Sequence, residues 1–112
     1  MNTVEFQNWI LLNNIVERTK KSFWNYVENY RNEEPEEFSE VFSDVNMDSL
    51  EITISKVSFT VNYTFDEPIT FIAAFADIEY EDREIGVYES LYSLDGDDLD
   101  DDYLRLKDWL SL

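Results

Sequence analysis

The spacing of apolar residues changes once along this chain, and that change limits the possible folds more than any other feature. From residue 52 onward, apolar and polar side chains alternate, which is the pattern of a strand with one buried face. In residues 3–31 apolar side chains instead recur every three or four positions, which predicts a helix with one buried stripe, made of Phe6, Trp9, Leu12, Val16, Phe23, Val27 and Tyr30. Helices are therefore predicted first and strands after them.

Two helices are predicted before residue 50. The first covers residues 3–31, with Asn13 and Asn14 as the weak point at which it can bend. The second starts at Pro35, a residue that suits the first helical position, and closes at Asn46. Its apolar residues fall on one face and are Phe38, Val41, Phe42 and Val45.

The first strand region, residues 50–65, contains a shift of phase. Ile52 and Ile54 alternate in one phase, and the apolar residues from Val57 to Phe65 alternate in the other. Two interpretations stay open: one long strand with a bulge, or a hairpin that turns at residues 55–56.

Two further strands and a tail follow. Residues 69–80 contain successive apolar side chains, which indicates a strand buried on both faces at its centre. Residues 85–94 form the next strand, with Ile85, Val87 and Leu91 on one face and the two tyrosines of the strand on the other. Residues 97–102 are predicted to be an acidic loop, and residues 103–112 either a last strand or a docking helix.

Short polar turns join these strands, so they are expected to pair antiparallel. The predicted fold class is α+β, a single domain over residues 1–112 with N-terminal helices packed on an antiparallel sheet of about four strands. The other sheet face is expected to be partly open, and its candidate occupants are Tyr63, Tyr88 and Tyr92.

Charge is the feature that bears most on function. The net charge is −18, and residues 33–102 hold 22 of the 26 acidic residues against only Lys56 and Arg83. Such a field attracts a positively charged partner and opposes direct contact with nucleic acid or an anionic membrane. The sequence therefore predicts a basic protein partner, with solubility or a salt-adapted habitat as the alternative explanation of the charge.

The residue types argue against catalysis. The chain has no His and no Cys, so the commonest general base, the thiolate nucleophile and the soft metal ligands are missing. The acidic run that starts at Asp95 does not fit an EF-hand, because its fifth, sixth and twelfth positions are Leu99, Asp100 and Leu106. We expect no enzyme activity, no cofactor and no metal site.

The expected location is the cytoplasm. Without Cys the chain cannot form a disulfide, so nothing in the sequence indicates an oxidising compartment. Glu5, Asn8 and Asn13 interrupt the apolar region that a signal peptide would need. No apolar run approaches the roughly 20 residues needed to span a bilayer. Membrane attachment is therefore not expected.

The predicted partner-binding residues belong to two acidic sets and the tyrosines near them. Both sets flank the strand at residues 85–94, so they should lie at its opposite ends. One continuous patch would require side chains along the strand, or the glutamates of residues 33–40, to connect them. The predicted residues are Asp77, Glu79, Glu81, Asp82, Glu84, Tyr88, Tyr92, Asp95, Asp97, Asp98, Asp100, Asp101, Asp102 and Tyr103.

Residues 85–104, IGVYESLYSLDGDDLDDDYL, resemble the tyrosine-rich strand, Asp-Gly turn and acidic return of small bacterial immunity proteins. Those proteins neutralise polymorphic or contact-dependent toxins. The resemblance implies a cytosolic inhibitor that covers the active site or substrate groove of a cognate toxin, often a nuclease, and it assigns no role to single residues. Two alternatives stay open: a phage-type nucleic-acid mimic that inhibits a restriction or CRISPR nuclease, and a non-inhibitory acidic scaffold or regulatory subunit. The oligomeric state is also left open.

Overall fold

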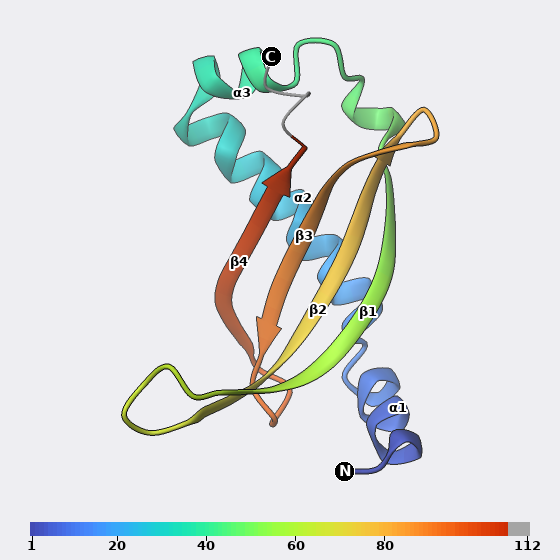
Figure 1. The fold of residues 1–112 in the computed structure, drawn as a ribbon. Helices are drawn as coiled ribbons and strands as arrows, with labels where there is room; N and C mark the ends of the chain where they lie inside the picture. The colour runs from blue at the N-terminus through green and yellow to red at the C-terminus, as the bar shows by residue number, and fades with distance from the viewer. Residues whose placement is uncertain (108–112) are drawn as a thin grey trace.

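The computed structural model describes residues 1–107, in which helices cover one face of a four-stranded antiparallel sheet (Figure 1). The helices are α1 (Thr3–Leu12), α2 (Ile15–Glu33) and α3 (Pro35–Val41), followed by the 3₁₀ turn η1 (Met47–Ser49). The strands are β1 (Glu51–Asn62), β2 (Ile69–Tyr80), β3 (Arg83–Tyr92) and β4 (Asp98–Leu106), side by side in chain order. The predicted α+β class is confirmed.

The predicted first helix is divided in two at Asn13 and Asn14. Asn14 has a left-handed backbone with φ 52°, which ends α1 and starts α2 in a new direction. The break also changes which side chains face the sheet. Ile15 and Thr19 are buried, whereas Leu12, predicted in the buried stripe, is 86% exposed. The prediction of a continuous stripe through Leu12 and Val16 is therefore wrong.

The larger core lies between α2 and the sheet. Phe23 and Val27 of α2 pack with Ile78, Ile85 and Tyr88, and the rings of Phe23 and Tyr88 meet edge to face at 5.5 Å. Burial of each such side chain contributes about 1.5–3 kcal/mol. A further part of this core comes from the chain that leads into β1, namely Phe38, Phe42 and Leu50. Helix α3 is therefore held at one end of the sheet.

A second core lies where α1 meets α2. It contains Ile15, Ile72, Ala74 and Tyr92, with Phe6, Trp9 and Ile10 of α1 partly buried against it. The hydroxyls of Thr19 and Tyr92 lie 2.8 Å apart in this core, so the polar group that Tyr92 buries has a partner.

Strand β1 is one strand with a bulge, not a hairpin. Its register with β2 shifts between Ile54 and Lys56, and the extra Ser55 donates its hydroxyl to the Phe75 carbonyl at 3.2 Å. A second shift, between Ile78 and Glu79, turns Ile85 into the core. The prediction that Ile85 shares a face with Val87 is wrong for this reason.

Of the acidic residues predicted as a loop, Asp98, Asp100, Asp101 and Asp102 belong to β4, and Asp97 precedes it. Asp98 pairs with Tyr92 and Asp102 with Ser90, while Asp100 has φ 54° in the irregular stretch between them. Pairing with β3 has overridden the low strand propensity of aspartate. Of the two forms predicted for residues 103–112, the strand is present up to Leu106, and residues 108–112, with Trp109 and Leu110, lie outside the described residues.

Within residues 1–107, no helix has both the length and the apolar character needed to cross a bilayer.

Candidate functional site

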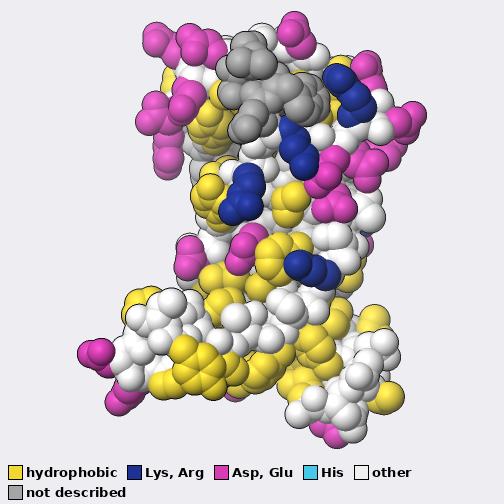
Figure 2. Space-filling view, viewed as in Figure 1, with side chains coloured by type: hydrophobic (Ala, Val, Ile, Leu, Met, Phe, Trp, Pro, Cys, Tyr) yellow, Lys and Arg dark blue, Asp and Glu magenta, His cyan; other side chains and the backbone are white. Residues whose placement is uncertain are grey.

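The acidic residues gather in two places, at opposite ends of β3. Helix α3, η1 and the β2–β3 turn lie together at one end of the molecule (Figure 1), where the main-chain N–H of Asn46 donates to the Tyr80 hydroxyl at 3.2 Å. Figure 2 shows Asp and Glu side chains clustered there. We call this the acidic end; its carboxylates are Glu33, Glu34, Glu36, Glu37, Glu40, Asp44, Asp48, Glu51, Asp77, Glu79, Glu81, Asp82 and Glu84.

Several of these carboxylates sit where they cost stability. Glu79 pairs across the sheet with both Glu51 and Glu84, so three carboxylates stand in one row. Like charges directly opposite each other on neighbouring strands are destabilising. Lys107 reduces the repulsion at one end of the row, since its ammonium lies 3.5 Å from the Glu84 carboxylate.

The turn between β2 and β3 is also unfavourable for its residues. Glu81 and Asp82 both have positive φ, 51° and 63°, and Tyr80 pairs directly with Arg83. This is a two-residue turn in which Asn-Gly is strongly preferred. The chain thus keeps two carboxylates at the tip of the turn where uncharged residues would be more stable.

The second acidic set forms a groove with α2. Asp98, Asp100 and Asp102 of β4 face four polar residues of the helix across a hollow of about 430 Å³. The helix residues are Ser22, Asn25, Tyr26 and Asn29. We call this hollow the aspartate groove. It joins three of the predicted site residues, while Asp95, Asp97 and Asp101 are exposed outside its lining.

Two carboxylates of the groove are held by hydrogen bonds. Asp102 accepts from the Tyr88 hydroxyl at 2.7 Å and from the Ser90 hydroxyl at 3.1 Å, and Asp98 accepts from the Asp100 N–H at 2.8 Å. Burial, reinforced by the bond to Asp102, raises the pKa of Tyr88 far above its ordinary value. Tyr88 therefore stays a donor, and Asp102 keeps its orientation.

Among residues 1–107, the aspartates of the groove, Asp98, Asp100 and Asp102, have no ion-pair partner. Asn25 and Asn29 add amide groups to the opposite wall. Such a lining suits a guanidinium or ammonium group from outside, which could bond to the carboxylates and amide oxygens together. In the described chain, no group of three His, Cys, Asp or Glu residues converges to hold a metal ion.

The β3–β4 turn that leads into the groove is anchored to the helices. Arg18 donates to the carbonyl oxygens of Asn13 and Gly96, at 3.1 and 2.8 Å, and its guanidinium lies 5.0 Å from the Tyr92 ring. Gly96 has φ 91°, and the Asn13 side chain occupies the space that a Cβ would need. Glycine is therefore required here, and Arg18 has a structural role.

Two of the predicted tyrosine contacts are wrong. Tyr88 and Tyr92 are each 0% exposed and face the helices, because they share the inner face of β3 with Ser90. Neither can contact a partner or occupy the open face. Tyr63 is exposed, but it lies beyond the end of β1, whereas Tyr103 is exposed on the open face as a contact residue would be.

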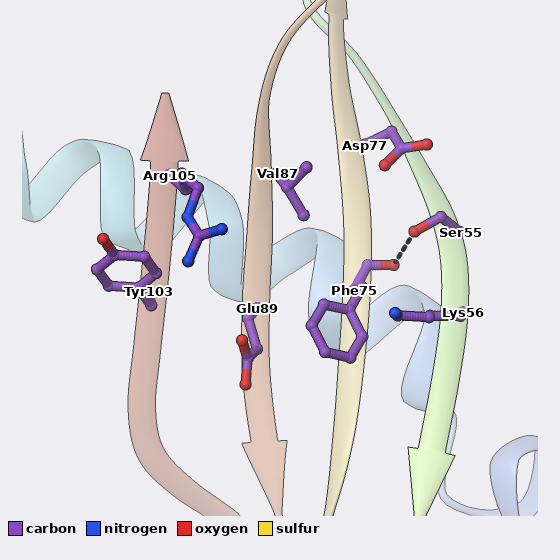
Figure 3. Close-up of a pocket in the computed structure, with 8 residues that line it drawn as sticks. All are labelled: Ser55, Lys56, Phe75, Asp77, Val87, Glu89, Tyr103 and Arg105. Atoms are coloured by element: carbon purple, nitrogen blue, oxygen red, sulfur yellow. Dashed lines mark hydrogen bonds between the residues drawn. The ribbon is translucent and has the colours of Figure 1, made fainter. Parts of the chain in front are cut away.

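The open sheet face holds a shallow pocket of about 400 Å³ (Figure 3). Phe75 and Val87 lie at its centre, and the lining is completed by Ser55, Lys56, Asp77, Glu89, Tyr103 and Arg105. The Lys56 ammonium is 4.5 Å from the Phe75 ring centre. Charges of both signs meet here, so this face interrupts the acidic surface.

Sequence reasoning missed Lys56, Glu89 and Arg105 as residues of one surface. Strand alternation was the available signal, because each of them lies one position away from an inward-facing residue. The bulge at Ser55 hid this for Lys56, and the assignment of residues 97–102 as a loop left the phase of Arg105 undetermined.

No family model matches this chain, and comparisons with curated proteins and with solved structures found no match. Surface chemistry is therefore the basis for a functional assignment.

Proposed function

We propose that this protein is an acidic binding protein that captures a basic partner protein and neutralises it by covering its functional surface. The aspartate groove is the observation that carries this proposal. It places Asp98, Asp100 and Asp102 in a hollow beside amide side chains, and no described cation pairs with them. A basic side chain of a partner would supply the missing charge.

The acidic end supports the same function in a different way. Its thirteen carboxylates include the unfavourable Glu51–Glu79–Glu84 row and the strained Glu81–Asp82 turn. Charge kept at a cost in stability is typical of a surface used for recognition. A concentration of charge of this size also speeds the approach of a basic partner over distances beyond direct contact.

The form of this function that we propose is a bacterial immunity protein bound to a toxin, such as a nuclease. A nuclease presents a basic surface to hold phosphates, which acidic side chains can cover. The aspartates of the groove lie within residues 85–104, the segment that resembles immunity proteins. A mimic of nucleic acid is less favoured, because Lys56 and Arg105 lie on the sheet face between the two acidic regions.

Co-expression with the protein encoded beside this gene tests the proposal. We expect the two proteins to co-purify, and the affinity of the complex to fall as ionic strength rises from low to moderate. We also expect the added acidic protein to inhibit the activity of the purified neighbour. An affinity that does not respond to salt would contradict the electrostatic mechanism, and an uninhibited neighbour would contradict neutralisation.

A further inference from the structure

Strand β1 has an outer side that pairs with no described strand. The half of β1 nearest the acidic end is protected against pairing with another chain, because it contains Glu51, Lys56 and the bulge at Ser55. Charged residues and bulges are the usual protection of an exposed edge. Residues 57–62, VSFTVN, have no such protection: no charge, no proline and no bulge.

Apolar side chains surround this unprotected stretch. Phe59 is 46% exposed on the helix-bearing side of the sheet, and Phe65 in the β1–β2 turn is 58% exposed. None of the ten residues of α1, all of them described, is buried, and Leu11 is 76% exposed. Figure 2 shows this end of the molecule covered largely by hydrophobic side chains. A helix with apolar residues on several faces is normally covered.

Charge decides what can cover this end. Residues 57–65 contain no charged side chain, α1 contains only Glu5, and the rest of the β1–β2 turn adds Asp66 and Glu67, so a basic partner has few carboxylates to bind here. A net charge of −18 opposes contact with an anionic membrane. A second copy of the chain carries the same charge, and residues 57–62 are the stretch of sheet edge at which two copies can meet with the fewest carboxylates between them.

We propose that residues 57–62 of β1 pair antiparallel with the same residues of a second copy, about a two-fold axis near Phe59 and Thr60. The two sheets then form one continuous sheet, with the helices of both copies on one side. In the two registers that keep the side chains on matching faces, Phe59 lies opposite Phe59 or Val61 of the second copy. Aromatic and β-branched cross-strand pairs of this kind are favourable.

This arrangement also keeps the acidic ends apart. Glu51 lies nine positions from Thr60, or about 30 Å along the strand, so the two acidic ends would be about 60 Å apart. That distance is several times the screening length in physiological salt, which is about 8 Å. Both aspartate grooves lie by the opposite edge strand, β4, and stay accessible.

Sedimentation equilibrium on the full chain tests the proposal. We expect a mass twice that of the 13.4 kDa chain at micromolar concentration. The variant Thr60→Glu puts a carboxylate close to its own symmetry mate and should weaken the dimer by about tenfold or more. Thr53→Glu is the control on the same strand and face, in the protected half. Its carboxylate stands opposite Asp77 and lowers the stability of the monomer, but it should leave the dimer intact. If Thr60→Glu does not fold, Ser58→Glu replaces it.

Salt separates this proposal from the proposed function. Two copies of equal charge repel, so added salt should strengthen the dimer, whereas it should weaken the complex with a basic partner. Hydrogen exchange should also show concentration-dependent protection confined within β1 to residues 57–62. A wild-type monomer at about 100 µM in high salt would overturn the dimer, and so would equal weakening by Thr53→Glu and Thr60→Glu.

Discussion

Strands β1 and β4 are the two edges of one sheet, and they differ in the charge that they expose. Between residues 98 and 102, β4 carries four aspartates, whereas residues 57–62 of β1 carry no charge. In the part of the chain that the structure describes, neither edge pairs with a further strand, so both present backbone groups that another strand could use. On β4 the carboxylates oppose pairing with a copy of the same chain, and in the proposed function they attract a basic partner instead.

The difference extends from the edges to the ends of the molecule. The acidic end carries thirteen carboxylates, whereas α1 and the β1–β2 turn together carry Glu5, Asp66 and Glu67. The β3–β4 turn, which docks on Trp9 and Asn13 of this end, adds Asp95 and Asp97. A chain of −18 that spread its charge evenly would repel its own copies on every side. Segregated charge allows one end to meet a basic partner while the other end can still associate with itself.

Asp102 gives the largest expected effect, because this aspartate of the β4 edge supports the fold as well as carrying charge. Its carboxylate accepts from the hydroxyls of Tyr88 and Ser90, both buried. Asp102→Ala leaves both hydroxyls without this acceptor and should lower the free energy of unfolding by about 2–4 kcal/mol. Asp101→Ala, an exposed neighbour on the same strand, should change it by no more than about 0.5 kcal/mol. Urea unfolding of both variants measures this, and equal effects would mean that Asp102 is only surface charge.

The charge of the β4 edge can be removed without changing its shape. Asp98→Asn, Asp100→Asn and Asp101→Asn together keep the side-chain acceptor at 98, and Asn tolerates the left-handed backbone at 100. We expect the affinity for the basic partner to fall by about 10- to 100-fold, measured by titration calorimetry at low salt.

The matched control removes three charges from the other end, with Glu5→Gln, Asp66→Asn and Glu67→Gln. Its total charge equals that of the β4 variant, and we expect its affinity to change by less than about threefold, because none of these residues lines the groove. If both triple variants lose the same affinity, net charge alone governs binding, and the position of the carboxylates on β4 does not matter.

The β2–β3 turn tests whether charge is kept at the expense of stability. Glu81→Asn with Asp82→Gly supplies the residues that this turn prefers and should raise the free energy of unfolding by about 1 kcal/mol. Association with the partner should slow by about twofold, because two carboxylates leave the acidic end. Glu81→Gln with Asp82→Asn removes the same charge without glycine and should slow association equally with a smaller gain in stability. A turn variant that is no more stable than wild type would remove this support for a recognition role.

The sequence pattern predicted those helices and strands whose ends are marked by turn residues or proline. The run of apolar residues and the turn residues around 69–80 predicted the bounds of β2, and Pro35 predicted the start of α3. The phase shift near Ser55 was visible, but a bulge and a tight turn have the same local sequence signal. Asn13 and Asn14 marked a weak point, yet the direction of the break comes from the left-handed Asn14 and from the docking of the β3–β4 turn on Asn13.

The candidate site was harder to predict because it is made by tertiary pairing. Asp98, Asp100 and Asp102 have low strand propensity, and they belong to a strand only because β3 offers them partners. Asn25 and Asn29 gave no signal of their own, since polar residues on a helix usually face water. Tyr88 and Tyr92 were assigned to an outer surface because alternation shows which residues share a face, not which face the helices cover.

The smallest expected effect is a loss of folding stability at high pH. It tests the buried side of the aspartate groove, where the Tyr88 hydroxyl donates to Asp102. Burial, helped by the bond to Asp102, raises the pKa of Tyr88 above its ordinary value of 10.0. Above pH 10 the unfolded chain loses this proton while the folded chain keeps it, so the unfolded state binds fewer protons and stability falls as pH rises. This contribution of Tyr88 to stability is fully present below pH 10, and about 1 kcal/mol of it should be lost by pH 10.5.

The variant Tyr88→Phe should flatten this decline of stability with pH. Some slope remains, because burial and Glu37 also raise the pKa of Tyr30. Tyr63→Phe, at the exposed β1–β2 turn, is the control and should keep the full decline. Urea unfolding of all three proteins between pH 9 and 10.5 measures this decline. If the free energy of unfolding of Tyr88→Phe falls as steeply as that of wild type, the raised pKa of Tyr88 is not the cause.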